Sequence, residues 1–134
     1  YMNSGEIEIS PELVVIVDDW KEAMISNDLP ISPFRRIRKI IVVDDSVVDF
    51  DAGYCNKPKQ IIYIARSTVN EGHWSTKAAI WHELGHFIFE LNHEDELSIM
   101  STYILHENIY KKRWQELEKH YINECKTHEE TARY

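Results

Sequence analysis

The chain has 134 residues, of which 43% are hydrophobic and 28% are charged, a composition typical of a folded globular protein. This length predicts a single domain spanning residues 1–134. Lys and Arg number 15 against 23 Asp and Glu, which gives a formal net charge of −8. We therefore expect no sequence-independent binding to nucleic acid or anionic membranes, because both require a basic face. No apolar segment approaches the roughly 18 residues of a membrane span.

The two cysteines, Cys55 and Cys125, are far apart in the sequence. They form neither a disulfide framework nor a CxxC zinc site, so they leave the redox compartment open. No signal-peptide pattern is visible at the start of the sequence. The sequence is therefore compatible with a secreted, a phage-associated or a cytoplasmic protein. It does not determine the oligomeric state.

The first half of the chain predicts a helix followed by two buried strands. Ser10 and Pro11 are typical of a helix start, since Ser caps free N–H groups and Pro suits the first turn. The strands are rich in β-branched residues. The expected elements are a helix over residues 10–26, a strand over 37–43, a loop over 44–58 with a short strand at 47–48, and a strand over 60–67.

The second half predicts two helices separated by an acidic, irregular segment over residues 92–100. One helix runs from Ser75 or Thr76 to Leu91, and the other covers residues 105–126. The last helix carries an apolar stripe formed by Tyr110, Trp114, Leu117 and Tyr121. Together these elements predict an α+β fold, in which an N-terminal, a central and a C-terminal helix cover a small mixed β-sheet.

The central helix contains the sequence HELGH at residues 82–86. Residues four apart in a helix point in nearly the same direction, so the His82 and His86 imidazoles can bind one metal ion. Glu83 lies on the adjacent edge of the helix, where it can reach a water on that metal. Zinc lowers the pKa of bound water to about 7, and a carboxylate can then accept its proton as general base. A chain of this composition contains about 0.04 such motifs by chance.

A catalytic zinc site usually has three protein ligands and one open position, so a third ligand is expected outside the motif. Glu90 lies one turn further along the helix, but its direction diverges from that of the histidine pair. His93 follows Asn92, a residue type that tolerates the left-handed conformation in which helices end. The candidates from the residues alone are Glu90, His93, Glu94, Asp95, Glu96, His106 and Glu107.

The segment HELGH…NHEDELSIMS resembles the metzincin clan of zinc peptidases, whose signature is HExxHxxGxxH followed by a methionine-containing turn. The resemblance implies a zincin-like fold and zinc ligation by His82, His86 and His93. It also implies Glu83 as the base and Met100 beneath the metal, and suggests Tyr103 as an oxyanion stabiliser. The sequence has one residue more than the signature before the third histidine, a spacing similar to that of short bacterial and phage peptidases. A helix extended to Asn92 would accommodate this residue.

The function expected from this resemblance is hydrolysis of peptide bonds in a peptide or protein substrate, with Zn²⁺ as the cofactor. In the gluzincin alternative, Glu107 is the third ligand. A second alternative is a zinc-binding interaction module without catalysis. The Cys55 thiolate could bind and silence the zinc, and the strand over residues 60–67 could be an edge strand that pairs with substrate. Ligand imidazoles usually donate their other N–H to a carboxylate or a carbonyl, and Glu90, Glu94 and Asp95 are nearby candidates for this role.

Overall fold

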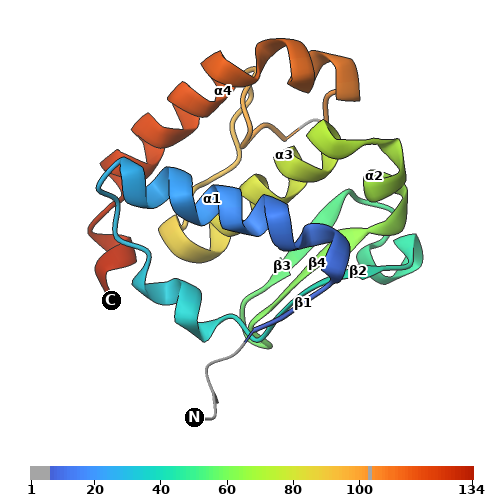
Figure 1. Cartoon of the computed structure of the whole chain (residues 1–134), viewed down its shortest axis with the longest axis horizontal. Helices are drawn as coiled ribbons and strands as arrows, with labels where there is room; N and C mark the ends of the chain where they lie inside the picture. Colours follow the sequence, from blue (N-terminus) through green and yellow to red (C-terminus); the bar gives the residue numbers. More distant parts are fainter. Residues whose placement is uncertain (1–6, 103) are drawn as a thin grey trace.

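The computed structural model describes residues 7–102 and 104–134 and shows a mixed α/β fold (Figure 1). The strands form one four-stranded mixed sheet in the order β1-β2-β4-β3. The strands are β1 (Glu8–Ile9), β2 (Lys39–Val43), β3 (Gly53–Asn56) and β4 (Ile61–Ala65). The α-helices are α1 (Val14–Ser26), α2 (Arg66–Glu71), α3 (His73–Leu84) and α4 (Glu107–Thr127). Short 3₁₀ helices cover Pro11–Leu13, Ser32–Arg36, Asp45–Val48 and Thr131–Arg133, and a π-helical turn covers Gly85–Phe89.

Three of the strands run parallel, and β3 is antiparallel to them at one edge of the sheet. β2 pairs with β1 and β4 in parallel, whereas β3 pairs only with β4. Because side chains alternate between the two faces of a strand, Ile40, Ile62 and Ile64 share one face, where they are fully buried. The β3 edge therefore leaves its outer hydrogen-bonding groups free of any other strand in the described part of the chain.

Helix α3 lies at the centre of the helical layer. It contacts β3 and β4 on one side and α1 and α4 on the other. Figure 1 shows the three long helices grouped together, with the strands on the opposite side of the molecule. The side chains that fix α3 are almost completely buried: Ala78, Ile80, Trp81 and Leu84. A helix held from several directions provides a rigid base for the histidines that it carries.

One buried hydroxyl joins the three long helices. The Tyr121 hydroxyl of α4 accepts a hydrogen bond from the Trp20 indole N–H of α1 at 3.0 Å. It donates to the main-chain carbonyl of Trp81 in α3 at 2.7 Å. Tyr121 has 1% of its surface exposed, so water cannot replace these partners.

We expect the substitution Tyr121→Phe to lower the free energy of unfolding by about 1–3 kcal/mol. The aromatic ring keeps its packing, but the Trp20 N–H and the Trp81 carbonyl lose a partner in a buried position. Urea unfolding monitored by tryptophan fluorescence measures the change. Tyr134→Phe is the matched control, since Tyr134 is 71% exposed. An unchanged unfolding midpoint for Y121F would show that the hydroxyl does not connect these helices.

The predicted N-terminal, central and C-terminal helices and the two strands are confirmed, within a mixed α/β fold. All four residues of the predicted stripe on the last helix are buried in α4. No helix among residues 7–102 and 104–134 combines the length and apolar character that crossing a membrane requires.

Several local predictions were wrong. Ser10 does not cap the first helix with its side chain; its hydroxyl instead accepts a hydrogen bond from the Val42 N–H. Residues 47–48 belong to a 3₁₀ helix rather than a short strand. Strand β3 lies within the segment expected to be loop, and α2 begins at Arg66, within the segment expected to be a strand. β3 consists of Gly, Tyr, Cys and Asn, so its conformation depends on pairing with β4 rather than on local preference.

Candidate metal centre

The structure brings three imidazole rings together at the end of α3. The Nε2 atoms of His82 and His86 lie 3.1 Å apart, and those of His82 and His93 lie 3.2 Å apart. The three ring centroids are separated by 4.7 to 5.1 Å. The third ring thus comes from outside the helix and points at the same space as the other two.

Main-chain carbonyls fix the orientation of the two helical imidazoles. The Nδ1–H of His82 donates to the carbonyl of Ile99 at 2.8 Å, and the Nδ1–H of His86 donates to the carbonyl of Leu91 at 2.7 Å. Because a carbonyl only accepts, each ring carries its proton on Nδ1. Both Nε2 lone pairs are therefore directed at the space between the rings, as metal ligation requires.

A π-helical turn explains how His93 reaches this position. Residues 85–89 form the turn, with i→i+5 hydrogen bonding that places more residues in one turn than an α-helix does. The helix then ends at Glu90, whose φ of 55° is left-handed, and not at Asn92 as predicted. The extra residue before the third histidine is absorbed within the helix, and the chain reverses so that His93 faces His86.

The segment after His93 folds back under α3. The N–H of Glu94 donates to the carbonyl of Met100, and the N–H of Thr102 donates to the carbonyl of Glu94. This closed loop presents the Ile99 carbonyl to His82. Met100 is 2% exposed, and its sulfur would lie 2.9 Å from a Cβ atom built on Gly85. The absence of a side chain at position 85 therefore allows the methionine to pack directly against the histidine-bearing helix.

Glu83 is buried beside the imidazoles. It has 7% of its surface exposed and lies against Gly53 of β3, where a Cβ atom would be 3.3 Å from its carboxylate. Burial, followed by the negative charge of Asp51, raises the pKa of Glu83 to about 8. Burial also lowers the pKa of His82 to about 4, so this imidazole is neutral at physiological pH.

The raised pKa of Glu83 predicts a pH-dependent stability of the metal-free protein. The folded chain holds the Glu83 proton up to about pH 8, whereas the unfolded chain releases it near 4.5. The folded state binds more protons between these values, so the free energy of unfolding falls as pH rises through this window. We expect Glu83→Gln to remove this loss, so that the stability of the variant relative to wild type rises by roughly 4 kcal/mol between pH 4.5 and pH 8.

Urea unfolding of both chelator-treated proteins at pH 4.5 and pH 8 measures this difference. Every other titrating group is common to the two proteins, so its contribution cancels in the comparison. A stability difference that is the same at both pH values would contradict a strongly perturbed carboxyl group at position 83.

The three histidines open into a cleft of about 880 Å³. One wall of the cleft is formed by Gly53, Tyr54 and Cys55 of β3. Its floor is the face of α3 that carries Ala79 and His82. Burial and the negative charge of Glu83 raise the pKa of Cys55 to about 12. Cys55 belongs to none of the groups of described residues that could hold a metal ion, so the structure gives no support to the alternative in which its thiolate silences the site.

The structure does not bring the other third-ligand candidates to the histidine pair. The Glu107 carboxylate accepts hydrogen bonds from the Trp74 and Ser75 N–H groups at the opposite end of α3. Glu90 forms an ion pair with Lys57 at 3.4 Å. Glu94 accepts a hydrogen bond from His120 at 3.0 Å, and this pair joins with Glu96 in a separate group. Neither Asp95 nor His106 belongs to a described metal-binding group, and Tyr103 lies outside the described residues.

Two predictions about the surroundings of the site were wrong. The partners of the His82 and His86 imidazoles are the carbonyls of Ile99 and Leu91, and not Glu90, Glu94 or Asp95, the carboxylates considered as candidates. The strand expected at the edge, β4, lies inside the sheet, and β3 is the edge strand. The sequence offered no signal for these carbonyls, because any residue type supplies one. Gly53 is the residue in the sequence that marks the close approach of β3 to Glu83, since a side chain there would contact the Glu83 carboxylate.

The function of this site has to be inferred from its geometry. No protein-family model, no curated protein and no solved structure matches this chain. Three converging imidazoles, two of them with fixed tautomers, and one buried carboxyl group define what the site can do chemically.

Proposed function

We propose that this chain is a zinc-dependent peptidase with a zincin-like fold, in which His82, His86 and His93 bind the metal and Glu83 is the general base. The observation that carries this proposal is the convergence of three Nε2 atoms beside a buried carboxyl group in an open cleft. Neighbouring imidazoles, a buried carboxyl group and an open cleft are each common alone. Together they match the number of ligands and the general base of a hydrolytic zinc site.

The three nitrogens fit zinc well. Ligand nitrogens at 2.0–2.1 Å from a tetrahedral ion lie about 3.3 Å apart, and the two Nε2 separations are 3.1 and 3.2 Å. An all-imidazole set suits zinc rather than magnesium or calcium, which prefer oxygen ligands. When bound, zinc supplies Lewis acidity that polarises a carbonyl and lowers the pKa of water to about 7.

The chain's own residues then move the proton. Glu83 accepts a proton from the attacking water and passes it to the nitrogen of the leaving amine. Burial raises the pKa of Glu83 in the metal-free protein, and the positive charge of a bound zinc would lower it again, which would leave the carboxylate able to accept the first proton. The carbonyls of Ile99 and Leu91 keep two imidazoles in place while charge develops.

The open edge of β3 supports a substrate bound in extended conformation. The Ala65 N–H donates to the Ala52 carbonyl, and hydrogen-bonded pairs alternate along an antiparallel ladder. The register therefore directs the N–H and C=O groups of Gly53 and Cys55 away from β4 and along the cleft. Main-chain pairing with a substrate at this edge gives affinity without requiring particular side chains.

We expect Cys55→Pro to lower kcat/KM for peptide substrates about tenfold. The proline removes the main-chain N–H of residue 55, which faces away from β4, and disturbs the adjacent hydrogen-bonding groups of β3. The ladder to β4 does not use this N–H, and an edge strand tolerates proline on its free side. Cys55→Ala, which keeps the N–H, is the matched control and should retain activity close to wild type. Equal activities of C55P and C55A at equal zinc content would argue against pairing at this edge.

Hydrolysis of unfolded casein by the zinc-loaded protein tests the proposal directly. Activity should disappear with 1,10-phenanthroline and return when zinc is restored. Three imidazoles and one water in the X-ray absorption spectrum would identify the coordination shell. Full zinc occupancy without cleavage of casein or a broad peptide library would instead assign the chain as a zinc-binding interaction module.

A further inference from the structure

The cleft continues beyond the metal centre toward the start of α3. Its lining includes Ser75, Ala78, Ala79 and His82, which follow one face of the helix. Ser75 and His82 are seven residues apart, about 10 Å along the helix axis. The alanines between them leave this path free of bulky side chains, so the same cleft extends from the metal centre to a recess near the start of the helix, lined by Glu71, Ser75 and Tyr110.

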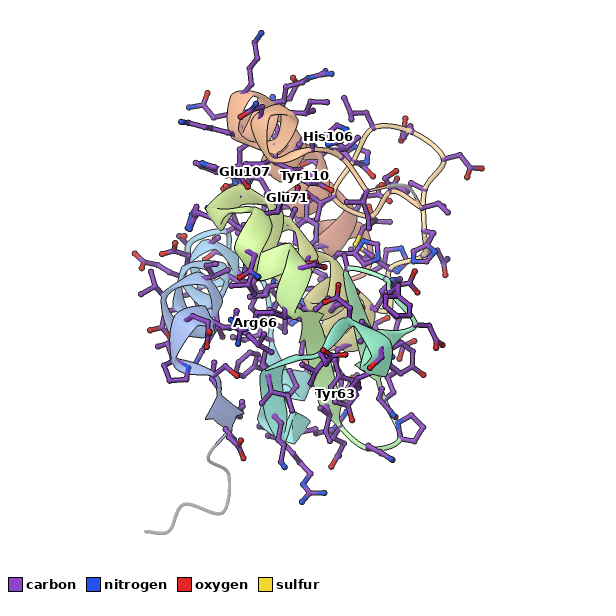
Figure 2. All side chains as sticks on the ribbon, turned by 90° about the vertical axis from the view of Figure 1, so that its right-hand side faces the viewer. Tyr63, Arg66, Glu71, His106, Glu107 and Tyr110 are labelled. Atoms are coloured by element: carbon purple, nitrogen blue, oxygen red, sulfur yellow. The ribbon has the colours of Figure 1, made fainter. Side chains whose placement is uncertain are left out.

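Glu71 provides the charge in this recess. It is an exposed residue at the end of α2, and one of its carboxylate oxygens accepts a hydrogen bond from the Ser75 hydroxyl. No described residue donates to the other oxygen, and no described Lys, Arg or His forms an ion pair with Glu71. Figure 2 shows Glu71 beside Glu107 and Tyr110, where α3 and α4 begin. Burial, with a smaller contribution from the negative charge of Glu71, raises the pKa of Tyr110.

The charges along the cleft do not balance. Among the described lining residues the only Lys or Arg is Lys57, and it is paired with Glu90. Among the described residues, no Lys or Arg forms an ion pair with Asp51 or Glu71. The walls of the recess are otherwise suited to an aliphatic stem, since Ala78, Ile104 and the Tyr110 ring line it. A long side chain with a cationic end can lie along such walls and place its charge at the carboxylate.

We propose that Glu71 makes this recess a specificity pocket for an arginine or lysine side chain next to the scissile bond. This inference rests on the proposed peptidase function and names its substrate class as basic peptides. Because Ser75 and His82 are about 10 Å apart along the helix, a substrate side chain must be long to approach Glu71 from a backbone near the metal. Lysine and arginine are long and cationic, and a guanidinium can bind the carboxylate through two parallel hydrogen bonds.

The test begins with the zinc-loaded protein and a casein digest, in which mass spectrometry of the products maps the cleavage sites. Arg and Lys should be enriched at one position flanking the cut bond. A synthetic peptide series then varies that position among arginine, its neutral isostere citrulline, norleucine and glutamate. We expect kcat/KM for arginine to exceed that for citrulline roughly tenfold in the wild type, and Glu71→Gln to reduce this ratio to about twofold or less.

Controls separate a specific contact from general attraction or from a structural role. Glu22→Gln makes the same change of net charge at an exposed site on α1 and should keep the tenfold ratio. Glu71→Lys should reverse the preference, so that glutamate exceeds arginine at this position. A wild type without basic preference, or an E71Q variant that lowers activity on all peptides with the ratio unchanged, would overturn the proposal.

A binding measurement distinguishes failure of this proposal from failure of the proposed function. Fluorescence anisotropy of labelled arginine and citrulline peptides is measured on zinc-loaded Glu83→Gln, which does not depend on cleavage. Tighter binding of the arginine peptide that is lost in E83Q/E71Q supports the pocket even if no hydrolysis is found. Equal affinities for the two peptides overturn it.

Discussion

Replacing Glu83 with glutamine is expected to lower kcat by two to four orders of magnitude, the usual contribution of a positioned general base. Glutamine has nearly the same shape as glutamate but cannot accept the proton of the attacking water. The side chain sits against Gly53 in a buried position, so a larger or differently shaped residue would also disturb the fold. Steady-state cleavage of a fluorogenic peptide measures kcat and KM.

The zinc content of the variant separates catalysis from metal binding. Glu83 is not a member of the imidazole group, so E83Q should hold one zinc per chain with unchanged affinity. Glu22→Gln, at an exposed position of α1, is the control for loss of a carboxylate elsewhere. Activity of E83Q within tenfold of wild type would mean that another group takes the proton.

Replacing His93 with alanine is expected to weaken zinc binding more than 100-fold. Loss of a group that only orients a ligand costs 10- to 100-fold in affinity, and loss of a ligand itself should cost more. His93 is the only one of the three rings that lies outside the helix and is exposed, so its removal should leave α3 intact. Competition with a chromogenic chelator measures the affinity, and circular dichroism checks the fold.

The controls for H93A address both the fold and the alternative ligand. His128→Ala removes a histidine beyond the end of α4 and should bind zinc like the wild type. If H93A keeps full zinc affinity and Glu107→Gln loses it, the gluzincin arrangement would replace the one proposed here. In the structure the Glu107 carboxylate instead caps the start of α3, so we expect E107Q to lower stability and leave zinc affinity unchanged.

The parts of the fold that the sequence predicted are those with a strong periodic pattern. The α4 stripe and the β-branched runs of β2 and β4 follow from which side chains must be buried. β3 escaped prediction because only Tyr54 among its four residues favours a strand, so its conformation depends on pairing with β4. The same reason hid the edge position of β3, since strand order depends on how distant segments pack.

The histidine pair and its glutamate were predictable because helical spacing alone fixes their relative directions. The position of His93 was expected, but its cause was not, since the π-helical turn and the left-handed Glu90 leave no distinctive residue pattern. Glycine is the usual residue in that conformation, and a glutamate there gives no warning that the helix ends. The perturbed pKa of Glu83 required knowledge of the burial by β3.

Main-chain carbonyl groups hold the His82 and His86 rings, and this determines which mutations the site can tolerate. Every amino acid has the same main-chain oxygen, so no point substitution at Leu91 or Ile99 deletes an anchor outright. Insertions and deletions between residues 90 and 100 are different, because they shift which oxygen faces each ring. Natural or engineered diversity should therefore accumulate here as exchanges of side-chain identity, while the length of the segment stays constant.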